Sequence, residues 1–156
     1  MSRALTVLHI DTERGWRGGE RQVFWLAREM KRLGHRPLIA ARPRELLATR
    51  ASAARIEVVA CNPGSELDLR AAWRLRSAIR RASVDVVHAH TAHAVTLGAF
   101  AVIGTRIPLV AARRVDFPLR RGPTSKWKYG RAARIIAVSE AVKEGLKSTP
   151  IGLGAE

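Results

Sequence analysis

Residues 84–103 read VDVVHAHTAHAVTLGAFAVI, and this stretch contains the pattern from which the fold can be predicted. Residues 84–89 form a short apolar run, rich in valine, that is typical of a buried strand. Residues 91–103 form a longer, largely apolar segment that suits a helix. Three histidines, His88, His90 and His93, lie where the strand ends and the helix begins. The stretch therefore predicts a strand, a short polar junction and a helix.

The same unit recurs along most of the chain. Strands are predicted at residues 5–10, 37–41, 55–60, 84–89, 107–111 and 134–138. Helices are predicted at residues 18–33, 45–53, 65–81, 91–103, 125–130 and 139–146. Because strands that alternate with helices form parallel sheets covered on both faces, we expect an α/β, Rossmann-like three-layer domain with a mainly parallel sheet of about six strands.

Two of the predicted helices have a clear apolar face. In the first, the 3.6-residue period places five side chains inward, and Gly34 ends the helix: Val23, Leu26, Ala27, Met30 and Leu33. In the helix that follows the Asn62-Pro63-Gly64 turn, the inner residues are Leu69, Ala72, Leu75 and Ile79. Ser65 and Asp68 resemble a capping box at its start.

Composition indicates a folded protein of the cytoplasm. A chain of 156 residues, of which 47% are hydrophobic, is long enough to bury one core. Its single cysteine, Cys61, can form no internal disulfide, which suits a reducing compartment. The first ten residues show no signal-peptide pattern, and the nearly apolar stretch at residues 93–104 is shorter than a membrane-spanning helix.

The net charge of +15, from 28 basic and 13 acidic residues, allows three interpretations. The three are an ordinary solvated surface rich in arginine, attraction to the anionic inner face of a membrane, and binding to nucleic acid. The solvated surface is favoured, peripheral contact with the inner face of a membrane is the leading functional alternative, and no specific nucleic acid is expected.

Parallel sheets bind ligands beyond the carboxyl ends of their strands, so the segments after each strand are the candidate sites. After the first strand, residues 11–20 include Gly18 and Gly19, whose backbone could approach an anion closely. Their spacing differs from the dinucleotide-binding G-x-G-x-x-G, and a plain flexible loop is the alternative.

The three histidines after the fourth predicted strand could bind a metal, face a substrate or pack in the sheet. His88 and His90 lie on the same side of the strand, and His93 lies in the first turn of the helix. The spacing is similar to the H-x-H-x-D-H of metallo-β-lactamase-like hydrolases, but Ala92 occupies the place of the aspartate and no histidine follows. We therefore expect no metal. His88 suits packing, whereas His90 is expected to be partly exposed and to face a substrate.

After the fifth predicted strand, Arg113 and Arg114 suit a phosphate or carboxylate, although a solvated basic loop fits equally well. The segment at residues 126–129, KWKY, interleaves bases and aromatics, which could stack nucleobases but favours helix packing.

Taken together, these segments resemble glycosyltransferase family 4, a family of the GT-B type. The matching pieces are GGE at residues 18–20, LGH at 33–35, DVVHAH at 85–90, PLV at 108–110, RRVDF at 113–117 and RIIAVSE at 134–140. The resemblance covers residues 4–147, which it identifies as an N-terminal glycosyltransferase domain and one half of a GT-B fold. Residues 148–156 would be a tail or the start of an interdomain linker.

The resemblance implies a retaining, metal-independent transfer of a sugar from a nucleotide sugar to a saccharide or lipid-linked acceptor, without a cofactor. In that picture His90 is catalytic, with His93 as a second candidate, and Gly18 and Gly19 contact the donor phosphate or sugar. The acceptor, expected to be anionic and part of a cell-envelope glycan, would meet the residues Arg113, Arg114 and Asp116.

One departure from the family concerns the donor. The family's pair of glutamates eight positions apart, in its second domain, has no counterpart here. We therefore expect an excised domain, a truncated product or half of a split enzyme, which binds the donor mainly through a missing C-terminal domain and is inactive alone. The alternative is a non-enzymatic basic α/β module that binds nucleic acid or an anionic membrane.

Overall fold

Strands and helices alternate strictly in the computed structural model, which describes residues 3–114 and 122–147. The strands are β1 (Thr6–Ile10), β2 (Arg36–Ala41), β3 (Glu57–Ala60), β4 (Val86–Ala89), β5 (Leu109–Arg113) and β6 (Ala132–Ala137). The helices are α1 (Gly18–Arg32), α2 (Leu46–Ala53), α3 (Leu69–Arg81), α4 (Ala92–Ala101), α5 (Pro123–Gly130) and α6 (Glu140–Lys147). All six predicted strands and all six predicted helices are present, with bounds that differ by a few residues.

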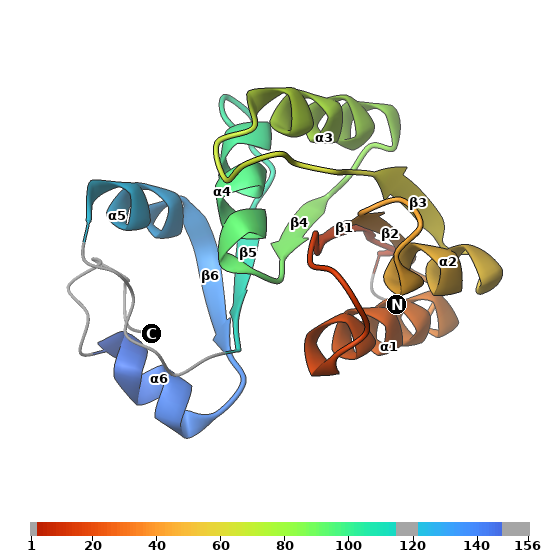
Figure 1. Ribbon diagram of the computed structural model, residues 1–156, viewed down its shortest axis with the longest axis horizontal. Coiled ribbons are helices and arrows are strands. Elements are labelled where there is room, and N and C mark those ends of the chain that lie inside the picture. Colours follow the sequence, from red (N-terminus) through yellow and green to blue (C-terminus); the bar gives the residue numbers. More distant parts are fainter. Residues whose placement is uncertain (1–2, 115–121, 148–156) are drawn as a thin grey trace.

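The strands form one six-stranded sheet in the order β3-β2-β1-β4-β5-β6, and all of its neighbouring pairs are parallel. The predicted Rossmann-like α/β fold is thereby confirmed. Because β1 is followed in sequence by β2 on one side and paired with β4 on the other, the strand order reverses between β1 and β4 (Figure 1). In such sheets the crevice at this reversal is where ligands bind.

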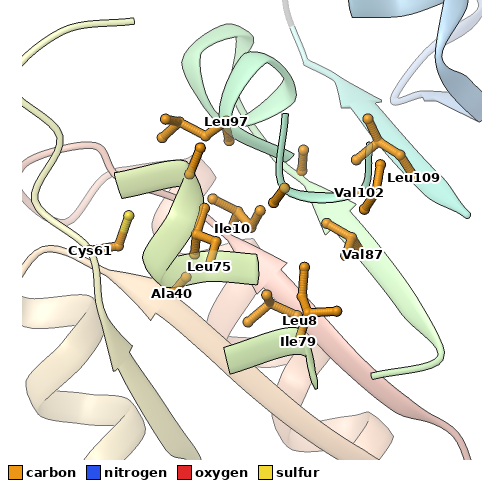
Figure 2. Packing of buried hydrophobic residues seen from close by; sticks show 14 of the residues in the cluster. Leu8, Ile10, Ala40, Cys61, Leu75, Ile79, Val87, Leu97, Val102 and Leu109 are labelled. Carbon is orange, nitrogen blue, oxygen red and sulfur yellow. The ribbon is translucent and has the colours of Figure 1, made fainter. Parts of the chain in front are cut away.

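The three layers follow from the alternation of side chains along β2. Leu38 and Ala40 point to one face and join the core under α3 and α4, whereas Ile39 and Ala41 point to the other and pack under α1 and α2. Figure 2 shows the first core, in which Leu75 and Ile79 of α3 lie over side chains of the central strands. Each face of the sheet therefore has its own buried cluster.

The predicted inner face of α1 is wrong in part. Its buried residues are Glu20, Val23, Phe24 and Ala27. Leu26 is 36% exposed and Leu33 is 60% exposed. The reason is that the sheet and α2 meet a narrow stripe of the helix, while Leu33 follows its last turn as the C-cap residue. Gly34 adopts φ +85°, which confirms it as the residue that ends the helix.

The start of α3 also differs from the prediction. Asp68 itself is the N-cap residue, because its side chain accepts a hydrogen bond from the amide of Ala71 at 3.0 Å. No capping box therefore involves Ser65. Leu69, the first residue of the helix, is 63% exposed, whereas Leu75 is fully buried. A helix's first turn projects past the sheet edge more easily than its middle, which the periodicity alone does not reveal.

The two leucines of α3 allow a matched test of this core. Leu75→Ala should lower the free energy of unfolding by about 3 kcal/mol, because it removes a fully buried side chain and leaves a cavity. Leu69→Ala, the same change on the same helix at an exposed position, should change it by less than about 0.5 kcal/mol. Urea denaturation measures both, and equal losses would contradict the described orientation of α3.

Candidate functional site

Three histidine rings gather at the point where the strand order reverses. His9 comes from β1, His88 from β4, and His90 from the residue after β4 ends at Ala89. The ring centroids of His88 and His90 are 4.0 Å apart, and the His9 ring lies 5.3 Å from His90 and 5.4 Å from His88. The prediction that His88 and His90 share one side of the strand is confirmed.

His9 was missed by the sequence analysis, which grouped the histidines by their nearness in sequence. The structure brings His9 in through strand pairing, since His9 and His88 are direct partners in the parallel register of β1 and β4. His93 is exposed in the first turn of α4, as predicted, and takes no part in this cluster of rings. A histidine in the apolar first strand was the signal that sequence reasoning passed over.

The expectation that His90 is partly exposed is wrong. His90 is 3% exposed and His9 is fully buried, whereas His88 has intermediate exposure. The backbone amide of His90 donates to the carbonyl oxygen of Ile10 at 3.0 Å, which extends the β1–β4 pairing by one residue and holds His90 within the sheet. Its ring is also covered by Arg114, so both neighbours withdraw it from solvent.

Arg114 connects the histidines to the loop after β1. Its Nη2 donates to Nδ1 of His90, and its Nη1 lies 3.7 Å from Oδ2 of Asp11. Asp11 is buried, and its Oδ1 accepts a hydrogen bond from the amide of Glu13 at 3.1 Å. The side chain of Arg114 is only 15% exposed. The structure therefore turns inward an arginine that the sequence analysis expected to meet the acceptor.

Gly19 leaves room for the guanidinium of Arg114. A Cβ atom added to Gly19 would lie 2.9 Å from Nη1 of Arg114, which is closer than real side chains allow. A Cβ on Gly18 would meet nothing within 4 Å. The two glycines therefore differ: Gly19 makes room for the guanidinium, and Gly18 borders open space at the start of α1.

The hydrogen bonds assign a proton to each of two rings. A guanidinium can only donate, so Nδ1 of His90 accepts from Arg114 and the ring proton of His90 is on Nε2. That Nε2 lies 3.0 Å from Nδ1 of His9 and donates to it, so the proton of His9 is on its own Nε2. In the described ranges, Nε2 of His9 and Nε2 of His88 are buried atoms without a hydrogen-bond partner.

The buried rings are neutral at physiological pH. Burial, with smaller contributions from His88 and Arg114, lowers the pKa of His9 to about 3. Burial and then Arg114 lower the pKa of His88 to about 4. The pKa of His90 is well below its ordinary value, again mainly through burial. Burial has the opposite effect on an acid and raises the pKa of Asp11 to about 6.

The three imidazoles are also a candidate metal site. One nitrogen from each ring lies within 4.8 Å of the others, so His9 supplies the third ligand that the sequence analysis did not find. However, both nitrogens of His90 are engaged, one by Arg114 and one by His9. The guanidinium charge next to them also opposes a cation. This ligand set fits a divalent metal poorly, and the absence of a metal stays a prediction.

Of the remaining predicted site residues, one lies apart from the histidine cluster and one lies outside the described residues. Arg113 is the last residue of β5, and its side chain hydrogen-bonds to Tyr129 of α5. Asp116 lies outside the described residues. The predicted contact of Asp116 with the acceptor therefore stays untested, whereas Asp11, which sequence reasoning missed, is the acid beside Arg114.

Comparisons with known proteins agree on one kind of domain. A family model described as Glycosyltransferase Family 4 matches residues 16–151. The structure of Anabaena HepE in complex with UDP and glucose aligns with a TM-score of 0.74 and 19% identity over 92% of this chain and 40% of HepE. A glycosyltransferase from Rickettsia africae aligns with a TM-score of 0.75 and 23% identity, over 95% of this chain and 40% of that one.

A third structure, the lipopolysaccharide outer core galactosyltransferase WaaB, aligns with a TM-score of 0.63 and 13% identity over 95% of this chain and 42% of WaaB. The chain thus spans about 40% of the length of these proteins. At these identities the likeness shows the fold alone. A search of curated proteins finds no significant match. None of the described helices combines the length and apolar content needed to cross a membrane.

The buried histidines predict that acid destabilises the chain. In the unfolded chain, His9 and His88 become protonated below their ordinary pKa of 6.5. In the folded chain, they stay neutral until the pH falls to about 4 for His88 and about 3 for His9. The unfolded state then binds more protons, so the free energy of unfolding falls as the pH drops from 6.5 to 4. Asp11 opposes this between about pH 6 and 3.8, because its folded form is protonated first.

Urea denaturation at pH 7.0, 6.0 and 5.0 measures this dependence. Since His90 acts in the same direction as His9 and His88, three histidines should outweigh one aspartate. His88→Asn should make the dependence shallower by about one proton, the number that one histidine contributes. A free energy of unfolding that stays flat or rises between pH 6.5 and 5 would contradict the lowered pKa values of these rings.

Proposed function

The chain belongs to glycosyltransferase family 4, and we propose that it is the acceptor-binding half of a retaining enzyme that moves a sugar from a nucleotide sugar to a saccharide or lipid-linked acceptor in cell-envelope glycan synthesis. Two kinds of comparison support this. The Anabaena HepE structures, which share the fold, hold UDP, glucose or UDP-glucose. WaaB acts on the lipopolysaccharide outer core. On this proposal the protein works in the cytoplasm.

The observation that carries the proposal is the polar cluster at the strand-order reversal. His9, His90, Asp11 and Arg114 come from three different strand ends and meet beside the start of α1. An ordinary core would place apolar side chains there, because a buried guanidinium and carboxyl are costly. In a crevice that binds a charged donor, the buried guanidinium and carboxyl have a function, because they can interact with the charge of the donor.

Within the site, Arg114 is proposed to face the donor. Its guanidinium lies beside Gly19 at the start of α1, where the backbone amides of Gly18 and Gly19 can approach a phosphate or the transferred sugar. Developing negative charge on the departing phosphate would be stabilised by a cation that is already fixed in place. Asp11 and His90 hold that cation, so the buried His90 acts mainly through Arg114.

His93 is proposed as the histidine that reaches substrate directly. It is exposed in the first turn of α4, at the same edge of the sheet as the cluster. This changes the roles that the resemblance implies: His90, expected to be catalytic, becomes a positioning residue, and His93, the second candidate, takes the contact with substrate. Arg113, which joins α5 through Tyr129, remains a proposed acceptor contact, as does Asp116.

A transfer assay tests the proposal. A protein that unites this chain with a family 4 donor-binding domain should transfer sugar from a UDP-sugar, whereas these residues alone should not, because they cover about 40% of the glycosyltransferases that share the fold. In the united protein, His90→Ala should lower the transfer rate by about 100-fold, the scale of a lost positioning or acid–base group. It should also lower the free energy of unfolding by about 1–3 kcal/mol, since the ring is buried and hydrogen-bonded.

The paired variant His93→Ala serves as the control for stability. Because the His93 side chain is exposed, this variant should have the same free energy of unfolding as the original chain. If His90→Ala transfers sugar at the original rate, His90 is structural and the assigned site fails. Donor hydrolysis by the chain without a second domain would contradict the proposal that a second domain binds the donor.

A second candidate, binding to an anionic membrane, is favoured by the outer side of α3. Leu69 and Trp73 are 63% and 69% exposed, and they lie one turn apart. Arg70, Arg74 and Arg80 are exposed on the same helix. A tryptophan and a leucine between arginines is the pattern of a helix that lies in a membrane interface. This surface of α3 is compatible both with the glycosyltransferase and with a non-enzymatic module. Its exposed apolar side chains favour lipid over nucleic acid as the binding partner.

Vesicle binding measures this second candidate. The chain should bind vesicles that contain anionic lipid more tightly than neutral ones, and salt should weaken the binding. Trp73→Ala should weaken it by several-fold, because the ring would be buried among the headgroups. Trp25→Ala, at a 55% exposed tryptophan on α1, is the matched control. Equal binding to neutral vesicles, or a preference for duplex DNA at physiological salt, would count against the membrane.

A further inference from the structure

A cavity of about 560 Å³ opens between the β3–α3 connection and the start of α5. Ser65, Glu66 and Leu67 form one wall, and the first turn of α5 forms the other, with Thr124 and Ser125. Both walls follow the carboxyl ends of strands, β3 and β5, so the cavity lies at the same edge of the sheet as the histidine cluster. Its volume is in the range of pockets that hold small molecules.

A buried lysine stands behind this cavity. Lys128 of α5 is 6% exposed, and its ammonium lies 2.5 Å from Oε1 of Glu66. It also lies 3.2 Å from Oγ1 of Thr96 and 3.2 Å from the carbonyl oxygen of Ala92. These three acceptors use all three protons of the ammonium. The KWKY segment thus packs as a helix, as the sequence analysis favoured, and Lys128 has no proton left for a ligand.

The lysine fixes Glu66 instead. Oε1 of Glu66 receives the ammonium and the Thr96 hydroxyl, the latter at 2.7 Å, while none of these bonds uses Oε2. The Glu66 side chain is 37% exposed, on the cavity wall. Hydrogen bonds from Lys128 and Thr96 oppose the effect of burial and lower the pKa of Glu66, so it stays ionised. A half-exposed carboxylate is therefore held in one place with an oxygen free to accept.

The chemistry of the two walls indicates a ligand. A fixed carboxylate accepts hydrogen bonds, and the hydroxyls of Ser65, Thr124 and Ser125 both donate and accept. Gly122, the N-cap residue of α5, offers no side chain to the amides of the first turn, which adds donors. An anion would meet the Glu66 carboxylate, which disfavours it. A neutral ring with several hydroxyls can bond to both walls at once.

We propose that this cavity, the Glu66 pocket, holds a neutral hydroxyl-rich sugar ring of the acceptor. This inference rests on the proposed function, because only a glycosyltransferase makes the bound sugar an acceptor. It also changes the acceptor site that was expected from the sequence. That site relied on Arg113, Arg114 and an anionic acceptor, whereas Arg114 is committed to Asp11 and His90. Glu66 becomes the principal specificity residue, and Lys128 becomes a positioning residue that acts through it.

Titration of the chain with methyl glycosides tests the pocket. Two-dimensional amide spectra would be recorded with methyl glucoside, methyl galactoside and methyl mannoside, up to about 50 mM, since single rings bind weakly. At least one glycoside should give saturable shift changes at residues 65–67 and 122–128. Sodium phosphate, as the anionic probe, should give none there. Shifts with phosphate only, or no glycoside shifts in these segments, would overturn the proposal.

Two variants sharpen the test. Glu66→Gln keeps the size of the side chain but removes its charge, and Thr124→Val keeps the shape but removes a hydroxyl. Glu66→Gln should weaken glycoside binding by about 10-fold, the loss expected for one good hydrogen bond to a charged group. Thr124→Val should weaken it by about 5-fold, because a neutral hydrogen bond contributes less. Glu57→Gln is the control, because Glu57 is also half-exposed and paired with an arginine, Arg36. A Glu66→Gln chain that is folded and binds glycosides like the original would overturn the proposal.

The pocket and the proposed function fail in different ways. In the united protein, transfer that is unchanged by Glu66→Gln would leave the glycosyltransferase function standing and remove the pocket. Glycoside binding at these residues, in a united protein that transfers no sugar, would leave the pocket and remove the function.

Discussion

The parallel pairing of β1 with β4 is the constraint on which the rest of this structure depends. It reverses the strand order, and it sets His9 directly beside His88 in the register. His90 continues that pairing by one backbone hydrogen bond to Ile10. A register shift of one residue would send these side chains to the opposite face of the sheet, so the apolar cores on both faces also fix the place of the imidazoles.

The cluster has a fixed direction of hydrogen bonding. Arg114 donates to His90, His90 donates to His9, and the sequence of donors ends at Nε2 of His9. Because the guanidinium never gives up its proton in this range of pH, neither ring can reverse its role while Arg114 stays in place. One permanent charge thus determines the protonation of two rings, which is why a positively charged group and two neutral histidines can share a buried volume.

Local patterns predicted the fold well, because strand length, helical period and turn residues are properties of neighbouring residues in sequence. The site was harder to predict, since its contacts join residues far apart in the chain. His90 was identified, but its burial was not, because burial depends on Arg114 and β1. His9 and Asp11 were missed, as nothing near them in sequence indicates their partners. Glu66 and Lys128 were missed as a pair for the same reason, although Lys128 was correctly assigned to helix packing.

The close approach of Gly19 to Arg114 has a consequence for the history of the family. A side chain at position 19 would displace the guanidinium from its present place, so a substitution there favours a smaller or shifted residue at position 114. The two positions should therefore change together among homologous sequences, and position 18, which borders open space, should vary independently of position 114. An evolutionary trajectory that exchanges the arginine for a smaller residue opens the helix start to larger residues at position 19.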